Sequence, residues 1–411
     1  MNYAINQSIV YREKNNNVFI LSEENSIIID GVGVDIWNYV IKGYSKEKII
    51  KLIAKKYKDV ERSIIEIDVE KTLNKLEKNN IIKQRNINQP ILSHFYDKID
   101  FLYKVVLELT YNCNNKCQYC YNGEYKENDL LSTEKIKEII DESYKLGAMH
   151  LSITGGEPLL RNDLLEILRY GNEKKFYITL QTNGTLLTDD IARSLSNIRP
   201  INVAITLHSH DYRIHDEFTR RKGSYTEAIN GIKLLKKYNI PVTIRYVVTK
   251  KNFDGIDDYD KLAKELGVHV NRSPLLYPTT DGSLEPLKLR LTEKQIEYLV
   301  QYKNYKPQKD PCGAGKTKII VSPEGKVYPC TFYHKELGDI CQYTIKQILN
   351  NNKTKNIQKM FEQPSYCREC DKEDNCPRCP VISYYEKNNF KDINPFDCMI
   401  ANVCKKEMIN E

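Results

Sequence analysis

The chain lacks long hydrophobic runs. No uninterrupted apolar stretch in its 411 residues approaches the roughly 18 residues that cross a bilayer. The N-terminal stretch MNYAINQSIVYREKNN also lacks the apolar core of a secretory signal peptide. Basic residues are not clustered, because 62 basic and 55 acidic residues are mixed along the chain for a net charge of +7. These absences argue against a membrane protein, a secreted protein and a nucleic-acid-binding protein. We therefore expect a cytoplasmic globular protein.

Cysteine is absent from residues 1–112 and 121–311, although the chain contains 12 cysteines. Three of them lie in the stretch CNNKCQYC, at Cys113, Cys117 and Cys120, and the other nine follow residue 311. In a reducing compartment such clusters bind metal more often than they form disulfides. We therefore expect metal sites at two places along the chain.

The hydrophobic pattern predicts a sequence of distinct units. Residues 1–85 combine three short strands with three helices, as in a winged-helix-like unit, and residues 86–99 form a polar linker. Over residues 100–275, six strands alternate with helices, which is the pattern of an α/β fold with a parallel sheet or a partial (β/α)6 TIM-like barrel. A bridge over residues 276–311 leads to a turn-rich, cysteine-rich tail over residues 312–411.

Polar motifs follow the ends of the predicted core strands. The three cysteines follow the first strand, Gly155–Pro158 the second, Asn183 the third and His208 the fourth. In parallel α/β folds the active residues lie at the carboxyl ends of the strands. The sequence therefore predicts a functional site at that end of the sheet.

The number of cysteines in CNNKCQYC indicates their chemistry. Three thiolates bind three irons of a [4Fe–4S] cluster and leave the fourth iron open to a substrate or cofactor. A zinc site completed by a distant ligand is the alternative that the spacing leaves open.

CNNKCQYC resembles the radical S-adenosylmethionine (SAM) signature C-x3-C-x-φ-C, with Tyr119 as the aromatic residue. The resemblance extends over residues 100–275 through TGGEPLL, LQTNGTLL and VAITLHSHDYRIHDEFTRRKG. It implies that Cys113, Cys117 and Cys120 hold a [4Fe–4S] cluster whose open iron chelates SAM. One electron from the cluster would then cleave SAM to a 5′-deoxyadenosyl radical.

The resemblance also implies contacts with SAM. Gly155 and Gly156 would let the backbone approach the methionine amino group, Glu157 would fix charge there, and Pro158 would stiffen the turn. Arg245 would either pair with the SAM carboxylate or form an ordinary ion pair. The other expected contacts, to the ribose and the carboxylate, are Thr182, Asn183 and Thr206.

One position departs from the family pattern. Relatives often read S-L-D-G where this chain has Thr206-Leu207-His208-Ser209. His208 would then point toward the expected cavity without a role that the resemblance supplies. A structural role and a role in proton transfer are both open, and no other catalytic residue is assigned.

The tail resembles the SPASM extension of radical SAM enzymes, although the third gap of CRECDKEDNCPRC has two residues instead of three. The resemblance implies two auxiliary [4Fe–4S] clusters. One would be held by Cys367, Cys370, Cys376 and Cys398, and the other by Cys312, Cys330 and Cys379. The second cluster would have an open iron unless Cys341 or Cys404 completes it. Zinc ribbons are the alternative.

Residues 1–85, which contain GVGVDIWNYVIKGYSKEKIIKLIAKKY, look like the PqqD-type peptide-recognition element. That element binds an extended leader peptide as an added strand. A generic winged-helix packing unit is the alternative.

Together the resemblances imply an enzyme that modifies a ribosomally made precursor peptide, with a flavodoxin- or ferredoxin-type electron donor. We expect hydrogen abstraction from a peptide carbon and a thioether cross-link from a substrate cysteine. Carbon–carbon cross-linking, epimerisation and sulfatase-type side-chain maturation are alternatives within the same chemistry. A zinc-stabilised peptide-binding protein without catalysis is an alternative of another class.

Overall fold

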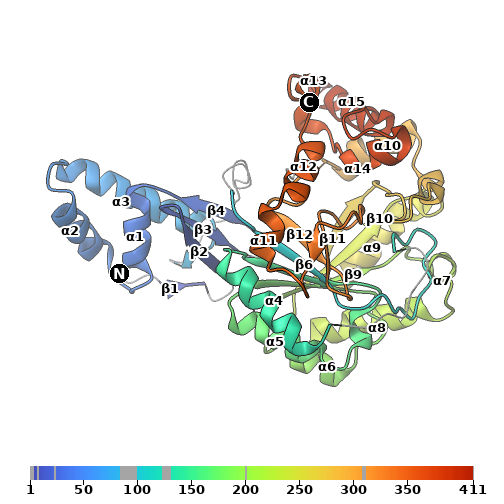
Figure 1. Ribbon diagram of the computed structural model, residues 1–411, viewed down its shortest axis with the longest axis horizontal. Helices are drawn as coiled ribbons and strands as arrows, with labels where there is room; N and C mark the ends of the chain where they lie inside the picture. The colour runs from blue at the N-terminus through green and yellow to red at the C-terminus, as the bar shows by residue number, and fades with distance from the viewer. Residues whose placement is uncertain are drawn as a thin grey trace.

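Figure 1 shows the computed structural model, which describes residues 4–6, 9–22, 25–83, 100–122, 131–199, 201–307 and 312–410. The N-terminal unit (blue) extends from one end of an α/β core, and the tail (orange to red) lies against the core. The linker predicted over residues 86–99 lies outside the described residues, and the predicted domain boundaries stay predictions.

The N-terminal unit contains a three-stranded antiparallel sheet of order β2-β3-β4 with helices on one face. The three strands of this sheet and the three helices are as predicted. A short strand pair, β1 with β5, closes the unit. The elements are β1 (Ala4–Ile5), β2 (Val10–Lys14), β3 (Asn17–Leu21), β4 (Ser26–Ile29), α1 (Val32–Val40), α2 (Lys46–Lys56), α3 (Arg62–Lys78) and β5 (Ile82–Lys83).

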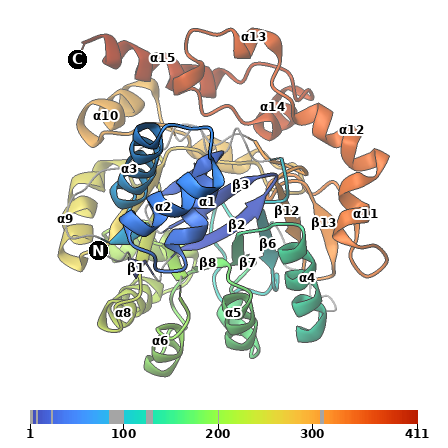
Figure 2. The same ribbon diagram turned by 90° about the vertical axis from the view of Figure 1, so that its left-hand side faces the viewer.

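The core contains the six predicted parallel strands in the order β11-β10-β9-β8-β7-β6. They are β6 (Lys104–Glu108), β7 (His150–Thr154), β8 (Tyr177–Thr182), β9 (Ile201–Thr206), β10 (Val242–Val247) and β11 (His269–Ser273). Helices surround the sheet on its outer face (Figure 2). They are α4 (Thr133–Lys145), α5 (Leu164–Glu173), α6 (Asp189–Leu195), α7 (Tyr212–Thr219), α8 (Ser224–Lys237) and α9 (Ile256–Leu266). The prediction of a partial barrel is confirmed, and α7 is a helix that the sequence reading missed.

The tail is more regular than its turn-rich sequence indicated. Strand β12 (Lys318–Val321) pairs in parallel with β6, so the tail extends the core sheet. Antiparallel strands β13 (Lys326–Tyr328) and β14 (Gly338–Asp339) complete a sheet of nine strands. The helices of the bridge and tail are α10 (Glu293–Lys303), α11 (Ile345–Asn350), α12 (Asn352–Phe361), α13 (Ser365–Arg368), α14 (Pro380–Lys387) and α15 (Pro395–Asn410). Short 3₁₀ turns are η2 (Pro158–Leu160), η3 (Phe253–Gly255), η4 (Glu285–Leu289) and η5 (Glu373–Asn375).

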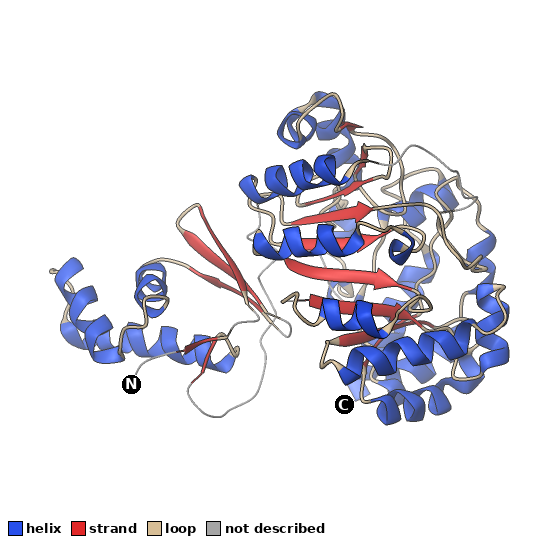
Figure 3. Cartoon of the chain, turned by 90° about the horizontal axis from the view of Figure 1, so that it is seen from below, coloured by secondary structure: helices blue, strands red, loops and turns tan. Residues whose placement is uncertain are grey.

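The N-terminal sheet buries both of its faces, because side chains alternate across a strand. On β3, Val18 and Ile20 face the helices of their own unit, while Phe19 and Leu21 face the core. The second face packs on residues at or just before the amino ends of the first core strands, which are Phe101, Tyr103, Met149 and Tyr177. The core strands point away from this contact (Figure 3). The N-terminal unit therefore lies at the end of the barrel opposite to the carboxyl ends of the strands.

Arg12 links the two units through polar contacts. Its Nη2 atom donates to the backbone oxygens of Lys174 (3.3 Å) and Lys175 (2.9 Å). Its guanidinium lies 4.4 Å from the ring centre of Tyr144.

Among the described residues, no helix is both long and apolar enough to cross a membrane.

We expect Arg12→Ala to destabilise the docked N-terminal unit by about 1.5–3 kcal/mol, the range for hydrogen bonds to charged groups. Urea unfolding followed by the fluorescence of Trp37, the one tryptophan of the chain, measures this because Trp37 is buried in the unit. The control Arg62→Ala removes an exposed ion pair with Glu66 and should cost about 0.5 kcal/mol or less. Equal effects of the two variants would contradict the docking role of Arg12.

Candidate active site

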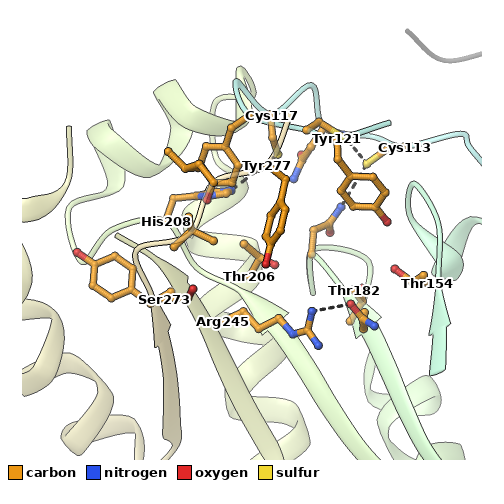
Figure 4. Close-up of a pocket in the computed structure, with 18 of the residues that line it drawn as sticks. Cys113, Cys117, Tyr121, Thr154, Thr182, Thr206, His208, Arg245, Ser273 and Tyr277 are labelled. Carbon is orange, nitrogen blue, oxygen red and sulfur yellow. Dashed lines mark hydrogen bonds between the residues drawn. The ribbon is translucent and has the colours of Figure 1, made fainter. Parts of the chain in front are cut away.

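A cavity of about 450 Å³ opens at the carboxyl ends of the core strands (Figure 4). Most of the residues predicted for the site line this cavity. They are Cys113, Cys117, Cys120, Gly155, Gly156, Thr182, Asn183, Thr206, His208 and Arg245. Glu157 and Pro158 are buried beside the cavity and do not line it.

The loop that carries the three cysteines is supported by the end of α7. The backbone N–H groups of Lys116 and Gln118 donate to Thr219 O and Phe218 O, each at 2.9 Å. From the same segment, Arg221 Nε donates to Asn115 Oδ1 at 2.8 Å. The helix that the sequence reading missed therefore shapes the cysteine loop.

The three thiols have an environment that suits metal-bound thiolates. Burial raises the pKa of Cys117, and the charges of Cys120 and Cys113 raise it further. Burial also raises the pKa of Cys113. Thiols gathered in this way stay protonated at neutral pH unless a cation compensates their charge, and metal ions do so. The donor set therefore fits an iron–sulfur cluster.

The two glycines of TGGEP are required by the cysteine loop itself. A Cβ on Gly155, whose φ is +132°, would lie 2.2 Å from Thr110 O, and one on Gly156 would lie 2.2 Å from Asn112 O. Gly156 N donates to Thr110 O at 2.7 Å. The turn after β7 and the start of the cysteine loop thus meet backbone to backbone. Access to a bound ligand, the role expected from the sequence, stays a prediction.

Glu157 joins this turn to the next strand. Its carboxylate accepts from Thr182 Oγ1 (2.6 Å), Asn183 N (2.8 Å) and Leu159 N (3.0 Å). Burial raises its pKa, and these three hydrogen bonds oppose the rise. The predicted charge contact of Glu157 with SAM is untested, and in this structure its oxygens bind protein groups.

Asn183 and Arg245 approach the cavity from the two strands that flank β9, since Asn183 follows β8 and Arg245 lies on β10. Asn183 Nδ2 donates to Asn114 Oδ1 at 2.7 Å and lies 3.9 Å from Cys113 Sγ. Arg245 reaches across from β10 and donates through Nη1 to Gln181 Oε1 at 2.7 Å (Figure 4). Its side chain is exposed to the cavity and forms no ion pair with a described residue. The ordinary ion pair considered from the sequence is therefore not present in the described structure.

Several cavity residues carry no sequence motif and were missed. Tyr277 stacks on Phe332, with ring centres 3.6 Å apart and planes at 5°, and Tyr121 meets Phe332 edge-on at 5.4 Å. Phe332 comes from the tail, two residues after Cys330. Its position two residues after Cys330 is the sequence signal that could have indicated Phe332. The other missed residues include Gln181, Asn271 and Ser273.

Within each of the two implied tail sets, the cysteines lie near one another. Burial raises the pKa of Cys379, and the charges of Cys330 and Cys312 raise it further. Burial likewise raises the pKa of Cys376 to about 12, with smaller contributions from nearby Cys398 and Cys367. Cys370 lies near Cys367 and Cys398. Each set thus gathers its thiols as cluster ligation would need, although the assignments themselves stay predictions.

The tail set of Cys312, Cys330 and Cys379 lies close to the cavity. Burial raises the pKa of Tyr277 well above its ordinary value, and the charges of Cys379 and Cys330 add to the rise. The Tyr277–Phe332 stack therefore lies between the cavity and these cysteines.

Asp397 lies near both tail sets, and its carboxylate accepts a hydrogen bond from Cys379 N at 3.1 Å. Burial raises the pKa of Asp397 to about 7.

The two spare cysteines lie in other surroundings. Cys341 is exposed after β14, where Asp339 Oδ1 accepts from its backbone N–H at 2.8 Å. Cys404 is buried on α15 near Tyr305.

Within the described ranges, no group of three or more histidine, cysteine, aspartate or glutamate side chains is arranged to hold one metal ion. Each cysteine of an iron–sulfur cube binds a different iron, so such cysteines surround a cluster without sharing an ion.

Comparison with protein families matches three parts of the chain. Residues 107–284 match the Radical SAM superfamily, residues 312–371 match the iron-sulfur cluster-binding domain SPASM, and residues 17–82 match coenzyme PQQ synthesis protein D (PqqD). The chain is a radical SAM/SPASM protein with a PqqD-like unit. This confirms the family resemblances found in the sequence.

Curated relatives differ in what they make. The chain is 27% identical over 331 residues to the AdoMet-dependent heme synthase of Methanosarcina barkeri, covering 71% of this chain and 95% of that protein. It is 28% identical over 320 residues to the antilisterial bacteriocin subtilosin biosynthesis protein AlbA of Bacillus subtilis, covering 72% of this chain and 69% of that protein.

A solved structure shares the whole fold. The crystal structure of Streptococcus suis SuiB bound to precursor peptide SuiA matches with a TM-score of 0.69 at 15% identity, covering 97% of this chain and 100% of that chain. At this identity the match shows the fold alone.

The radical SAM/SPASM domains imply [4Fe–4S] clusters and SAM as cofactors, and the protein is an enzyme of radical chemistry. The alternative of a zinc-stabilised binding protein without catalysis is therefore set aside.

Replacing Cys113, Cys117 and Cys120 together by alanine should abolish reductive SAM cleavage, because these three thiols alone among the described cysteines line the cavity. The iron content should fall by about four per chain, the content of one cube, while the tail clusters remain. Iron analysis and chromatography of 5′-deoxyadenosine measure the two results. Cys341→Ala should keep both, and 5′-deoxyadenosine production by the triple variant would refute the assignment.

Proposed function

We propose that this enzyme modifies a ribosomally made precursor peptide and joins a substrate cysteine to a peptide carbon through a thioether. The observation that carries the proposal is the arrangement around the cavity. A loop with three cysteines lies on one side, a second set of three cysteines lies behind the Tyr277–Phe332 stack, and a PqqD-like unit completes the chain.

The chemistry balances for a thioether. Cys113, Cys117 and Cys120 would hold a cluster that, with SAM, would supply a 5′-deoxyadenosyl radical able to take one hydrogen atom from the peptide carbon. The substrate thiol would lose a proton and its sulfur would bond to that carbon, and the surplus electron would pass to an oxidised cluster held by tail cysteines. The product therefore lacks two hydrogen atoms of the substrate.

The residues of the chain have distinct parts in this reaction. The cysteine loop and the Gly155–Gly156 turn hold the cluster end of the cavity, and Thr206 and Arg245 would bind polar and anionic groups of SAM. Tyr277 and Phe332 form an apolar wall that would exclude water from the radical. Cys312, Cys330 and Cys379 would leave one ligand position of their cluster for a substrate thiolate, unless Cys341 or Cys404 completes the set.

The N-terminal sheet offers an edge for the leader peptide. In the described structure β4 pairs only with β3, so its outer edge is unpaired. Ile28 O accepts from Lys75 Nζ at 2.7 Å, which shows that the backbone groups of Ile28 point to that edge. A peptide bound there must pass the length of the core strands, roughly 17–20 Å, to reach the cavity. At least about six extended residues must therefore separate the leader from the modified residue.

The electron donor that we propose is an acidic flavodoxin or ferredoxin. Lys116, Arg220 and Lys222 are exposed beside the cysteine loop and form no ion pair with a described residue. The Arg220 charge opposes the rise in the pKa of Cys117, so Arg220 lies near the cluster end of the cavity.

A cytoplasmic location agrees with the twelve unpaired thiols of the chain, because a reducing compartment preserves free thiols.

Anaerobic reaction of the reconstituted enzyme with SAM, dithionite and its precursor peptide tests the bond type. We expect a peptide that lacks two hydrogens and resists thiol alkylation. Replacement of the substrate cysteine by alanine should abolish the change. Loss of two hydrogens from the cysteine-free peptide would instead indicate carbon–carbon cross-linking. Unchanged mass with deuterium uptake from heavy water at a carbon would indicate epimerisation.

Hydrogen exchange followed by mass spectrometry tests the recognition edge. Adding the full precursor should slow exchange at Ser26–Ile29, because an added strand would accept from the outward N–H of Ile28. The control is the core peptide without its leader, which should leave this segment unchanged. Protection of β2 alone, or of no residue in the N-terminal unit, would contradict the proposed edge.

A further inference from the structure

His208 occupies a fixed position beside the cysteine loop. It follows β9, and its exposed fraction is 3%. Its backbone N–H donates to His215 Nδ1 at 3.1 Å, and its backbone oxygen accepts from Asn252 Nδ2 at 2.8 Å. Its ring stacks on Phe218, with centres 5.3 Å apart and planes at 22°. The two hydrogen bonds fix the backbone of His208, and the stacking on Phe218 fixes one face of its ring.

Both ring nitrogens of His208 face groups of the cysteine loop. Nδ1 lies 2.5 Å from Tyr119 Oη, and Nε2 lies 3.7 Å from Cys117 Sγ, as Figure 4 shows for the histidine and the cysteine. The Tyr119 hydroxyl lies within hydrogen-bond distance of Nδ1, to which it can donate a hydrogen bond. A neutral imidazole that accepts at Nδ1 carries its proton on Nε2. The Nε2–H group therefore points at the sulfur of Cys117.

We propose that His208 is a positioning residue that donates a hydrogen bond from Nε2 to the Cys117 thiolate and thereby raises the reduction potential of the SAM-binding cluster. The proposal rests on the cluster ligands assigned above and is independent of the peptide substrate. Hydrogen bonds to cluster sulfurs are among the factors that set these potentials. A donor favours the reduced cluster because that state carries one more negative charge.

The hydroxyl of Tyr119 determines which ring nitrogen of His208 carries the proton. Tyr119 thereby fixes the tautomer of His208, and its ring packs edge-on against His208 at 5.3 Å. Without the hydroxyl, the imidazole proton could move to Nδ1 and the bond to sulfur would be lost in part. Tyr119→Phe should therefore shift the potential in the same direction as loss of His208, but by less.

Redox titration of the reconstituted enzyme, followed by electron paramagnetic resonance, tests the proposal without any peptide. The SAM-binding cluster is identified as the signal that changes when SAM is added. For His208→Leu we expect its midpoint to move to a more negative potential. The ratio of reduced to oxidised cluster at a fixed potential should fall about tenfold, which is about 59 mV for one electron.

Two variants separate this role from a structural one. His208→Gln retains an N–H donor, so its midpoint should lie between those of wild type and His208→Leu. The matched control is His210→Gln, because His210 lies beside Gly255 and Asp258 and should leave the midpoint unchanged.

A wild-type midpoint in a fully loaded His208→Leu enzyme would overturn the proposal. If His208→Leu fails to load iron, Tyr119→Phe decides the matter: a negative shift supports the proposal, and a wild-type midpoint overturns it.

Discussion

The site depends on a close backbone contact between two loops. The turn after β7 meets the start of the cysteine loop at positions where a Cβ would lie 2.2 Å from a carbonyl oxygen, so only glycine fits at Gly155 and Gly156. Glu157, next in the chain, then binds the end of β8 through Thr182 and Asn183. The carboxyl ends of β6, β7 and β8 are thereby connected by contacts between protein groups. The cysteine loop is held at one end by this contact and at the other by the end of α7.

The N-terminal unit and the cavity lie at opposite ends of the core strands. The N-terminal sheet packs on the amino ends of the first core strands, whereas the cavity lies at their carboxyl ends. The tail reaches the cavity through β12, which joins the core sheet beside β6, and through Phe332, which stacks on Tyr277. Recognition, radical generation and the auxiliary cysteines thus occupy different places around a common sheet. A long peptide that binds at one end and reacts at the other suits this arrangement.

Local sequence patterns predicted the elements that depend on local physics. The six core strands and most of the core helices were found from the period of their apolar residues. The first three cysteines were found from their spacing, and the tail sets were implied by the resemblance to the SPASM extension. Helix α7 was missed because its eight residues carry only a short apolar stripe. Strand β12 was missed because pairing with β6, more than 200 residues earlier in the chain, has no local signature. Glu157 was placed in the expected ligand shell, but only the fold shows that protein donors surround its carboxylate.

The cavity wall formed by Tyr121, Tyr277 and Phe332 could not be predicted for the same reason, since its members come from three distant segments. His208 was visible as a departure from the family pattern, yet its contacts with Tyr119 and Cys117 required the structure.

We infer that SAM binds to a cluster iron in the cavity lined by Cys113, Cys117 and Cys120. Electron–nuclear double resonance of the reduced enzyme with SAM labelled with ¹⁵N at its amino group tests this claim directly. We expect a resolved coupling between the cluster electron spin and the labelled nitrogen, which disappears when unlabelled SAM is used. A reduced, SAM-saturated enzyme without such a coupling would contradict it.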